Sequence, residues 1–205
     1  MAKLKAPLFS LGASGALGKT LVYFGWKGID VVREYVVPAN PKSDAQNAQR
    51  GWMIEAVEKV HLALADTAYP FLSIDKSAFS LLGSLQATPR TWFNTIVKQW
   101  IDQRVAEKNC AVISGGVITE ESTQVTLEAH VTASVGGDPT DGDIYCGTSK
   151  TSMLKVTACD ISELAAGKAV TGLTNGVKYF FQYRSNVPGA YIGVNSGIYT
   201  GTPHA

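Results

Sequence analysis

Apolar and polar residues alternate along residues 125–133, where Val, Leu and Ala positions lie between Thr, Glu and His. A period of two is typical of a β-strand with one buried and one hydrated face. Further β-branched and aromatic runs, separated by Gly, Asn and Asp turn residues, occur at 144–148, 153–158, 177–184 and 197–202. About seven short strands in roughly 95 residues predict an immunoglobulin-like β-sandwich over residues 110–205.

The pattern before residue 110 has a helical period. Residues 43–46 read Ser-Asp-Ala-Gln, a capping-box pattern that comes shortly after a proline. We therefore predict a helix from Ser43 to about Asp66. Its expected buried side is one apolar stripe, formed by Met53, Val57, Val60 and Leu64.

Two further helices are predicted in the same segment. A short one follows Asp75, and a longer one runs from Thr88, as the N-terminal cap, to about Lys108. Because the apolar faces of the three helices can bury one another, we expect residues 43–109 to form a small helical bundle.

Glycine and proline interrupt residues 1–42. Two β-branched and aromatic runs, at 20–24 and 29–37, flank the Gly-Trp-Lys-Gly sequence at 25–28, which predicts a β-hairpin. Outside the hairpin the arm has too few long apolar side chains to bury a core, so we expect it to pack on other chains. The predicted fold is α+β: an arm with a β-hairpin, a helical segment and an all-β sandwich.

Net charge limits the partners of this chain. It has 205 residues, with 18 Lys and Arg and 17 Asp and Glu, which gives a net charge of +1. This balance gives no electrostatic reason to expect nucleic acid as a partner. No apolar run reaches the roughly 18 residues of a membrane helix, so a membrane is not expected as a partner either. Residues 1–109 carry +4 and residues 110–205 carry −3, which favours head-to-tail docking between copies or onto a larger surface.

The cysteines and histidines are too scattered to predict a metal site. Cys110, Cys146 and Cys159 lack the Cys-x-x-Cys spacing, and the three histidines occur singly. An odd number of cysteines allows at most one disulfide, so a reducing compartment is the simpler interpretation. We expect no structural metal.

One segment resembles a phosphate-binding loop. Residues 13–20 read Ala-Ser-Gly-Ala-Leu-Gly-Lys-Thr, a loosened version of that motif. Such a loop must lead into a helix N-terminus, whereas the residues after Thr20 are β-branched, aromatic and broken by glycine. No Gly-x-Ser-x-Gly elbow or spaced catalytic set accompanies it. We therefore predict no catalytic residues, no cofactor and no enzyme activity, with nucleotide hydrolysis at the Gly15–Thr20 loop, which contains Lys19, as the alternative.

Residues 173–185 read Leu-Thr-Asn-Gly-Val-Lys-Tyr-Phe-Phe-Gln-Tyr-Arg-Ser. This segment resembles the E-to-F region of fibronectin type III domains. The resemblance implies a tyrosine corner, in which Tyr179 packs inward and its hydroxyl holds the turn after Leu173. The tryptophan that this family has in an early strand is absent, since none follows Trp100. A neighbouring immunoglobulin-like family is therefore the alternative.

Residues 26–28 read Trp-Lys-Gly, and an arginine, two prolines and the Ser-x-x-Gln sequence of residues 43–46 follow at fixed spacing. This pattern, over roughly residues 8–52, resembles a group of tailed-phage and prophage proteins associated with virion structure. The resemblance implies a virion component, assembled in the bacterial host cytoplasm, without known activity or cofactor. On a hairpin, we expect Trp26, Lys27, Arg33 and Tyr35 to make the assembly contacts.

The expected partners are other virion proteins and copies of this chain. Neutral charge and a compact display domain favour capsid decoration or a minor head protein over a tail or head-to-tail connector component. A module that binds host-surface glycan through residues such as Tyr191 and Tyr199 is a further alternative. For the hairpin itself, the alternative to a contact with other chains is that it packs only on the helices of its own chain.

Overall fold

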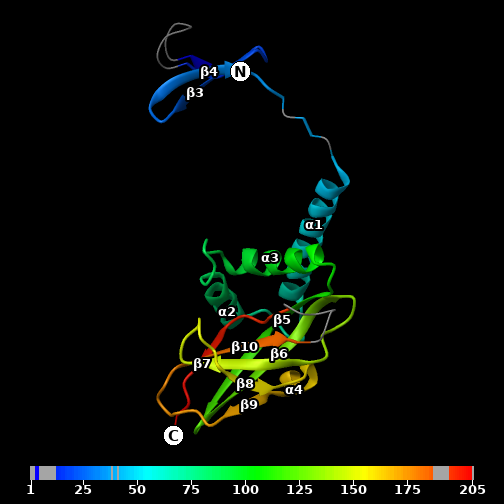
Figure 1. Cartoon of the computed structure of the whole chain (residues 1–205), viewed down its shortest axis with the longest axis vertical. Helices are drawn as coiled ribbons and strands as arrows, with labels where there is room; N and C mark the ends of the chain where they lie inside the picture. The colour runs from blue at the N-terminus through cyan, green and yellow to red at the C-terminus, as the bar shows by residue number, and fades with distance from the viewer. Residues whose placement is uncertain (1–2, 5–12, 38, 41, 187–193, 205) are drawn as a thin grey trace. The chain divides into compact units, whose positions relative to one another are not determined.

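The computed structural model describes residues 3–4, 13–37, 39–40, 42–186 and 194–204. Two compact units make up the chain, Met1–Ser43 and Asp44–Ala205 (Figure 1). We predicted three parts, residues 1–42, 43–109 and 110–205. In the structure the helices and the sandwich belong to the same compact unit.

The first unit is an antiparallel sheet with the strand order β1-β2-β3-β4. Its strands are β1 (Lys3–Leu4), β2 (Ala13–Leu17), β3 (Leu21–Trp26) and β4 (Ile29–Glu34). The predicted hairpin is confirmed, because Trp26 pairs with Ile29 across a two-residue turn. Lys27 and Gly28 in this turn both have positive φ, at 50° and 81°, which is typical of the type I′ turn that suits strand twist. The second strand ends at Glu34, earlier than predicted.

Three helices begin the second unit: α1 (Asp44–Ala65), α2 (Ser73–Gly83) and α3 (Trp92–Val105). The limits of α1 agree with the prediction. The predicted start of α3 was wrong, because Thr91, and not Thr88, has the extended backbone and accepts a 3.3 Å hydrogen bond from the Asn94 N–H. The Arg90 N–H donates to the Gly83 carbonyl at 3.4 Å, which holds the preceding residues in a turn.

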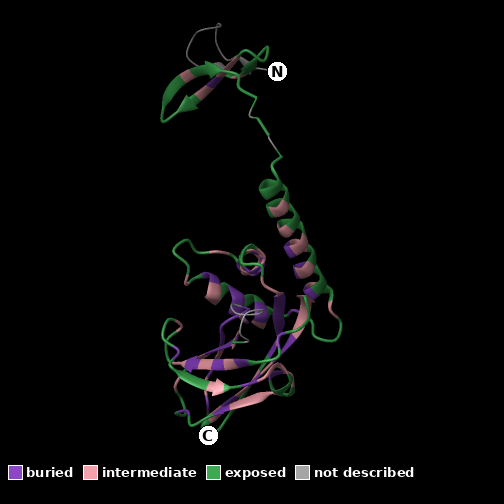
Figure 2. Cartoon of the chain, turned by 45° about the vertical axis from the view of Figure 1, so that its right-hand side comes forward, coloured by how far each residue is buried: buried purple, intermediate pink, exposed green. Residues whose placement is uncertain are grey.

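The buried side of α1 differs from the predicted stripe. Ala56, Val60 and Ala63 are its buried residues, whereas Met53 is 46% exposed. Small side chains on this face let the last turns of α1 pack closely on their neighbours, while the first turns are exposed (Figure 2). The Arg104 guanidinium then pairs with the Glu55 carboxylate and joins α3 to α1.

The predicted α+β fold with a β-sandwich is confirmed. Two antiparallel sheets have the strand orders β5-β6-β9 and β11-β10-β7-β8, and three strands packed against four are typical of immunoglobulin-like domains. A short helix, α4 (Ile161–Ala166), was not predicted; its cap is Asp160, which accepts from the Glu163 N–H at 2.7 Å. The strands are β5 (Cys110–Glu121), β6 (Gln124–Val135), β7 (Gly142–Gly147), β8 (Lys155–Ala158), β9 (Lys168–Thr171), β10 (Tyr179–Ser185) and β11 (Tyr199–Gly201).

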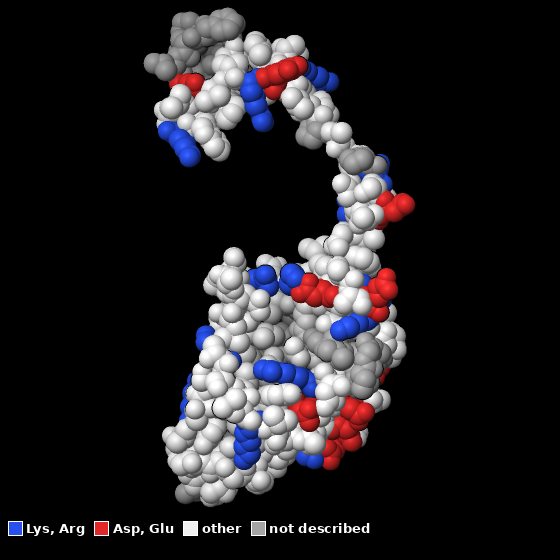
Figure 3. All heavy atoms as spheres, viewed as in Figure 1, with Lys and Arg blue, Asp and Glu red and all other residues white. Residues whose placement is uncertain are grey.

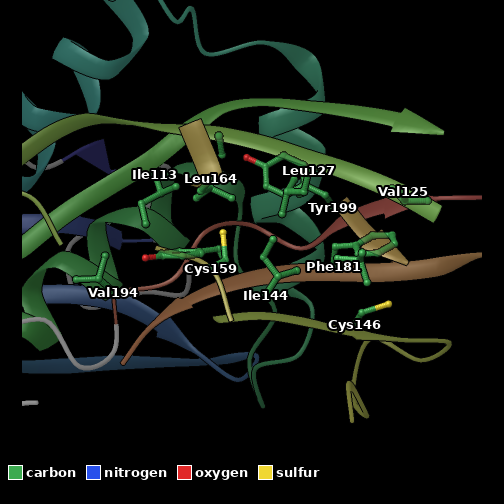
Figure 4. Packing of buried hydrophobic residues seen from close by; sticks show 14 of the residues in the cluster. Ile113, Val125, Leu127, Ile144, Cys146, Cys159, Leu164, Phe181, Val194 and Tyr199 are labelled. Carbon is green, nitrogen blue, oxygen red and sulfur yellow. The ribbon is translucent and has the colours of Figure 1, made fainter. Parts of the chain in front are cut away.

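The core of the sandwich lies between these sheets (Figure 4). Ile113 and Leu127 from one sheet pack with Ile144 and Phe181 from the other, and each is fully buried. Ala78 of α2 belongs to the same cluster, and its carbonyl accepts a 3.0 Å hydrogen bond from the Ile198 N–H. The helices therefore complete the sandwich core, which explains why both lie in one unit.

Candidate assembly surface

One side of the hairpin formed by β3 and β4 carries the two most exposed large apolar side chains of the strands in the first unit, Trp26 and Ile29. Directly paired residues of an antiparallel ladder share a face. The pairs Trp26–Ile29, Phe24–Val31 and Val22–Arg33 therefore lie on the same side. We call this side the aromatic face: Val22, Phe24, Trp26, Ile29, Val31 and Arg33.

The apolar side chains beside the turn are the most exposed in the strands of this sheet. Trp26 and Ile29, both on the aromatic face, are 60% and 67% exposed. On the opposite side Tyr23 is buried, and its ladder partner Val32 is 48% exposed. Large apolar side chains that stay in contact with water at neighbouring positions mark surfaces that other molecules cover. The aromatic face is thus a surface suited to a protein partner.

Two cations lie over the aromatic rings of this hairpin. The Arg33 guanidinium is 5.3 Å from the centre of the Phe24 ring, and the Lys27 ammonium is 5.9 Å from that of Trp26. These distances are those of cation–π contacts, which hold the charge beside apolar surface. Tryptophan, tyrosine and arginine are the residue types most enriched among the hot-spot residues of protein–protein interfaces.

Tyr35 follows the last residue of β4. Its N–H donates to the Thr20 carbonyl at 2.8 Å, so the ladder alternation continues by one residue and places Tyr35 on the side of Arg33. The structure therefore gathers Trp26, Arg33 and Tyr35 on one side, with Lys27 in the adjacent turn. Sequence reasoning missed Phe24 and Ile29, although the period of two along both runs would have identified them.

The outer edge of β4 adds a second kind of contact. The Tyr35 N–H points toward β3, so by alternation the backbone groups of Asp30, Val32 and Glu34 point away from it. β4 is the last strand of its sheet within the part of the chain that the structure describes. Such an edge can accept a strand from another chain.

The segment that resembles a phosphate loop lies on a hairpin. Ala13–Leu17 is strand β2, and Leu17 pairs with Leu21 of β3. The Thr20 N–H and hydroxyl both donate to the Leu17 carbonyl, at 3.0 and 2.9 Å. No helix follows Thr20 to supply converging N–H groups for phosphate. This geometry favours a turn over a nucleotide site.

The contact required of a tyrosine corner is present in the sandwich. The Tyr179 hydroxyl accepts a 3.1 Å hydrogen bond from the Thr174 N–H. Leu173 is buried in the sandwich core. Asn175 extends the same turn, since its Oδ1 accepts from the Thr123 N–H at 2.7 Å. Two hydrogen bonds therefore fix the turn before β10, and both residues of the predicted corner contribute to it.

Of the two tyrosines proposed for a glycan-binding surface, the structure describes only Tyr199. Tyr199 is buried, and its hydroxyl donates to Oδ1 of Asp75 at 2.7 Å, so the prediction of an exposed Tyr199 was wrong. Its position on a short strand beside glycines gave no local signal of burial. Tyr191 lies outside the described residues.

The cysteines are free thiols buried in the second unit. Burial raises the pKa of Cys110 and of Cys146 to about 11 and that of Cys159 to about 12. They are therefore protonated and unreactive near neutral pH. Among the described residues, no group of three His, Cys, Asp or Glu side chains could hold a metal ion. Nor does a helix in those residues have the length and apolarity to cross a bilayer.

No protein-family model matches the chain, and no curated protein matches it in sequence.

Proposed function

We propose that this chain is a non-enzymatic structural protein of a phage virion, held in the particle by its N-terminal unit. The observation that carries the proposal is the aromatic face, because its exposed Trp26 and Ile29 lie on a unit separate from the rest of the chain. The motif that resembles virion proteins includes Trp26 and Arg33 of this face. The particle surface is the preferred position, as a decoration or minor head protein.

The second unit suits display. It has its own core, and its α-helices and sheets bury that core without the first unit. A self-sufficient domain joined to an anchor by the proline-containing segment 35–43 can be presented outward. The tail or connector position remains the alternative location for the same anchor.

The test compares three chains in particle assembly. A chain without residues 1–42 should fold but should not enter particles, and Trp26→Ala should enter in reduced amount. Leu154→Ala is the control, because Leu154 is an exposed apolar residue of the other unit. Normal incorporation of the shortened chain contradicts the proposal.

A further inference from the structure

The two units carry opposite net charge. Met1–Ser43 has six Lys and Arg against two carboxylates, and Asp44–Ala205 has twelve against fifteen. Within the second unit the negative charge is concentrated in one stretch of the sequence. Between Lys108 and Lys150 the sequence has six carboxylates and no Lys or Arg. This stretch forms β5, β6 and β7.

The outward side of the β5-β6-β9 sheet displays part of this charge. Leu127 of β6 is buried in the core, so the alternate residues Thr126 and Glu128 point outward. The ladder pairs Val117 with Glu128 and Glu121 with Gln124, which places these β5 residues on the same side. We call this side the acidic face: Val117, Thr119, Glu121, Gln124, Thr126 and Glu128.

No lysine or arginine neutralises the acidic face within the described residues. Glu128 contacts His130 at 2.9 Å, and Glu121 accepts from the Gln124 amide. Val117, which is 47% exposed, lies directly opposite Glu128 in the ladder and is the apolar side chain of this face. Helix α4 contacts β6, and further carboxylates gather around the position of α4 in the view of Figure 3.

We propose that the aromatic face of one copy docks on the acidic face of a second copy. Arg33 and Lys27 would meet Glu121 and Glu128, and the apolar Trp26 would cover Val117. This inference rests on the proposed function, since both use the aromatic face, and it names the partner: another copy of this chain.

Charge complementarity selects a second copy as the occupant. The aromatic face belongs to a unit of +4 and the acidic face to a unit of −3. Complementary charge steers association and fixes the register of an interface. Because the two surfaces differ, the contact is heterologous and leads to a ring or an open chain of copies. Exposed charges are screened by salt, so the association should weaken as ionic strength rises.

The test uses full-length chains with reversed charges. One variant carries Lys27→Glu and Arg33→Glu, and the other carries Glu121→Lys and Glu128→Lys. Each alone should associate at least about tenfold more weakly than the wild type in sedimentation velocity at low salt. An equimolar mixture of the two should associate again, because each variant then meets an oppositely charged face on the other. An intramolecular contact could not be restored by mixing.

Lys178→Glu is the matched control, since it reverses an exposed charge outside both faces; it should associate like the wild type. If thermal melts show that the variant with Glu121→Lys and Glu128→Lys does not fold, the single substitution Glu121→Lys replaces it. A wild-type chain that stays monomeric at low salt, or a mixture that stays dissociated, overturns the inference. If particle incorporation still requires residues 1–42 in that case, the proposed function stands and only the partner is wrong.

Discussion

The Tyr199 hydroxyl donates a 2.7 Å hydrogen bond to Oδ1 of Asp75, and both residues are fully buried. Asp75 lies on α2 and Tyr199 on β11, so one bond joins the helices to the sandwich. The Gly116 N–H of β5 donates to the same oxygen at 2.9 Å, and the Leu72 N–H donates to Oδ2 at 3.0 Å. A buried carboxylate with three donors is a strong reason for the helices to keep one position on the sheets.

Tyr199→Phe should therefore destabilise the second unit. Removing one donor from a buried carboxylate costs about 1–3 kcal/mol of the free energy of unfolding, measured by urea denaturation. Tyr183→Phe is the matched control, because the Tyr183 hydroxyl is also buried but has no hydrogen-bond partner among the described residues. That change should be neutral or stabilising. Equal losses in the two variants would contradict the assigned role of the Asp75 contact.

The tyrosine corner predicts a smaller effect. Tyr179→Phe keeps the ring but removes the acceptor of the Thr174 N–H, which lies at an exposed turn and can bond water instead. We expect a loss of about 0.5–1.5 kcal/mol, seen as a melting temperature lower by about 1–6 °C. Tyr145→Phe on β7 should leave the melting temperature unchanged. A melting temperature of Tyr179→Phe equal to that of the wild type would show that the corner does not hold this turn.

The buried thiols predict a loss of stability at alkaline pH. Burial raises the pKa of Cys110 and Cys146 to about 11 and that of Cys159 to about 12, above the ordinary value of 9.0. The folded state keeps these protons where the unfolded state releases them. The stabilising contribution is thus complete below pH 9 and is lost as pH rises toward 11–12, by up to about 1.4 kcal/mol per pH unit for each thiol.

Urea denaturation under reducing conditions at pH 8 and pH 10 measures this loss. Above pH 10 the tyrosines also contribute, because burial raises the pKa of Tyr183 and of Tyr199. Thiol labelling gives an independent check: native protein should react slowly and unfolded protein at all three sites. A free energy of unfolding that does not change between pH 8 and 10 would contradict the prediction.

The two sides of the N-terminal sheet predict opposite phenotypes. Trp26→Ala removes an exposed side chain and should change the stability by less than about 0.5 kcal/mol while it reduces assembly. Tyr23→Ala removes a buried one and should destabilise the first unit by about 3–5 kcal/mol. Amide hydrogen exchange of residues 13–37 measures the stability of this sheet, and particle incorporation measures assembly. If Trp26→Ala unfolds the sheet, the ring is a core residue and not a contact.

Local patterns were enough for much of this fold. Period two and β-branched runs identified five of the seven sandwich strands, β6, β7, β8, β10 and β11, but not β5 and β9. The Gly-Trp-Lys-Gly sequence at 25–28 identified the hairpin. These signals depend only on neighbouring residues. The start of α1 followed from the capping-box pattern of residues 43–46 for the same reason. The four predicted assembly residues also came from sequence, although nothing in it showed that three of them share a side.

Tertiary packing decided the rest. Ala56 and Ala63 of α1 are buried, and the larger Met53 is not, because neighbouring elements approach this face of the helix closely. Tyr199, expected at the surface, is buried and donates to Asp75. Strand register placed Trp26 and Arg33 together. Sequence alone determined which segments became strands and helices, since that depends on local backbone preference and periodicity. Which faces were buried depended on contacts between segments far apart in the chain, which only the folded structure brings together.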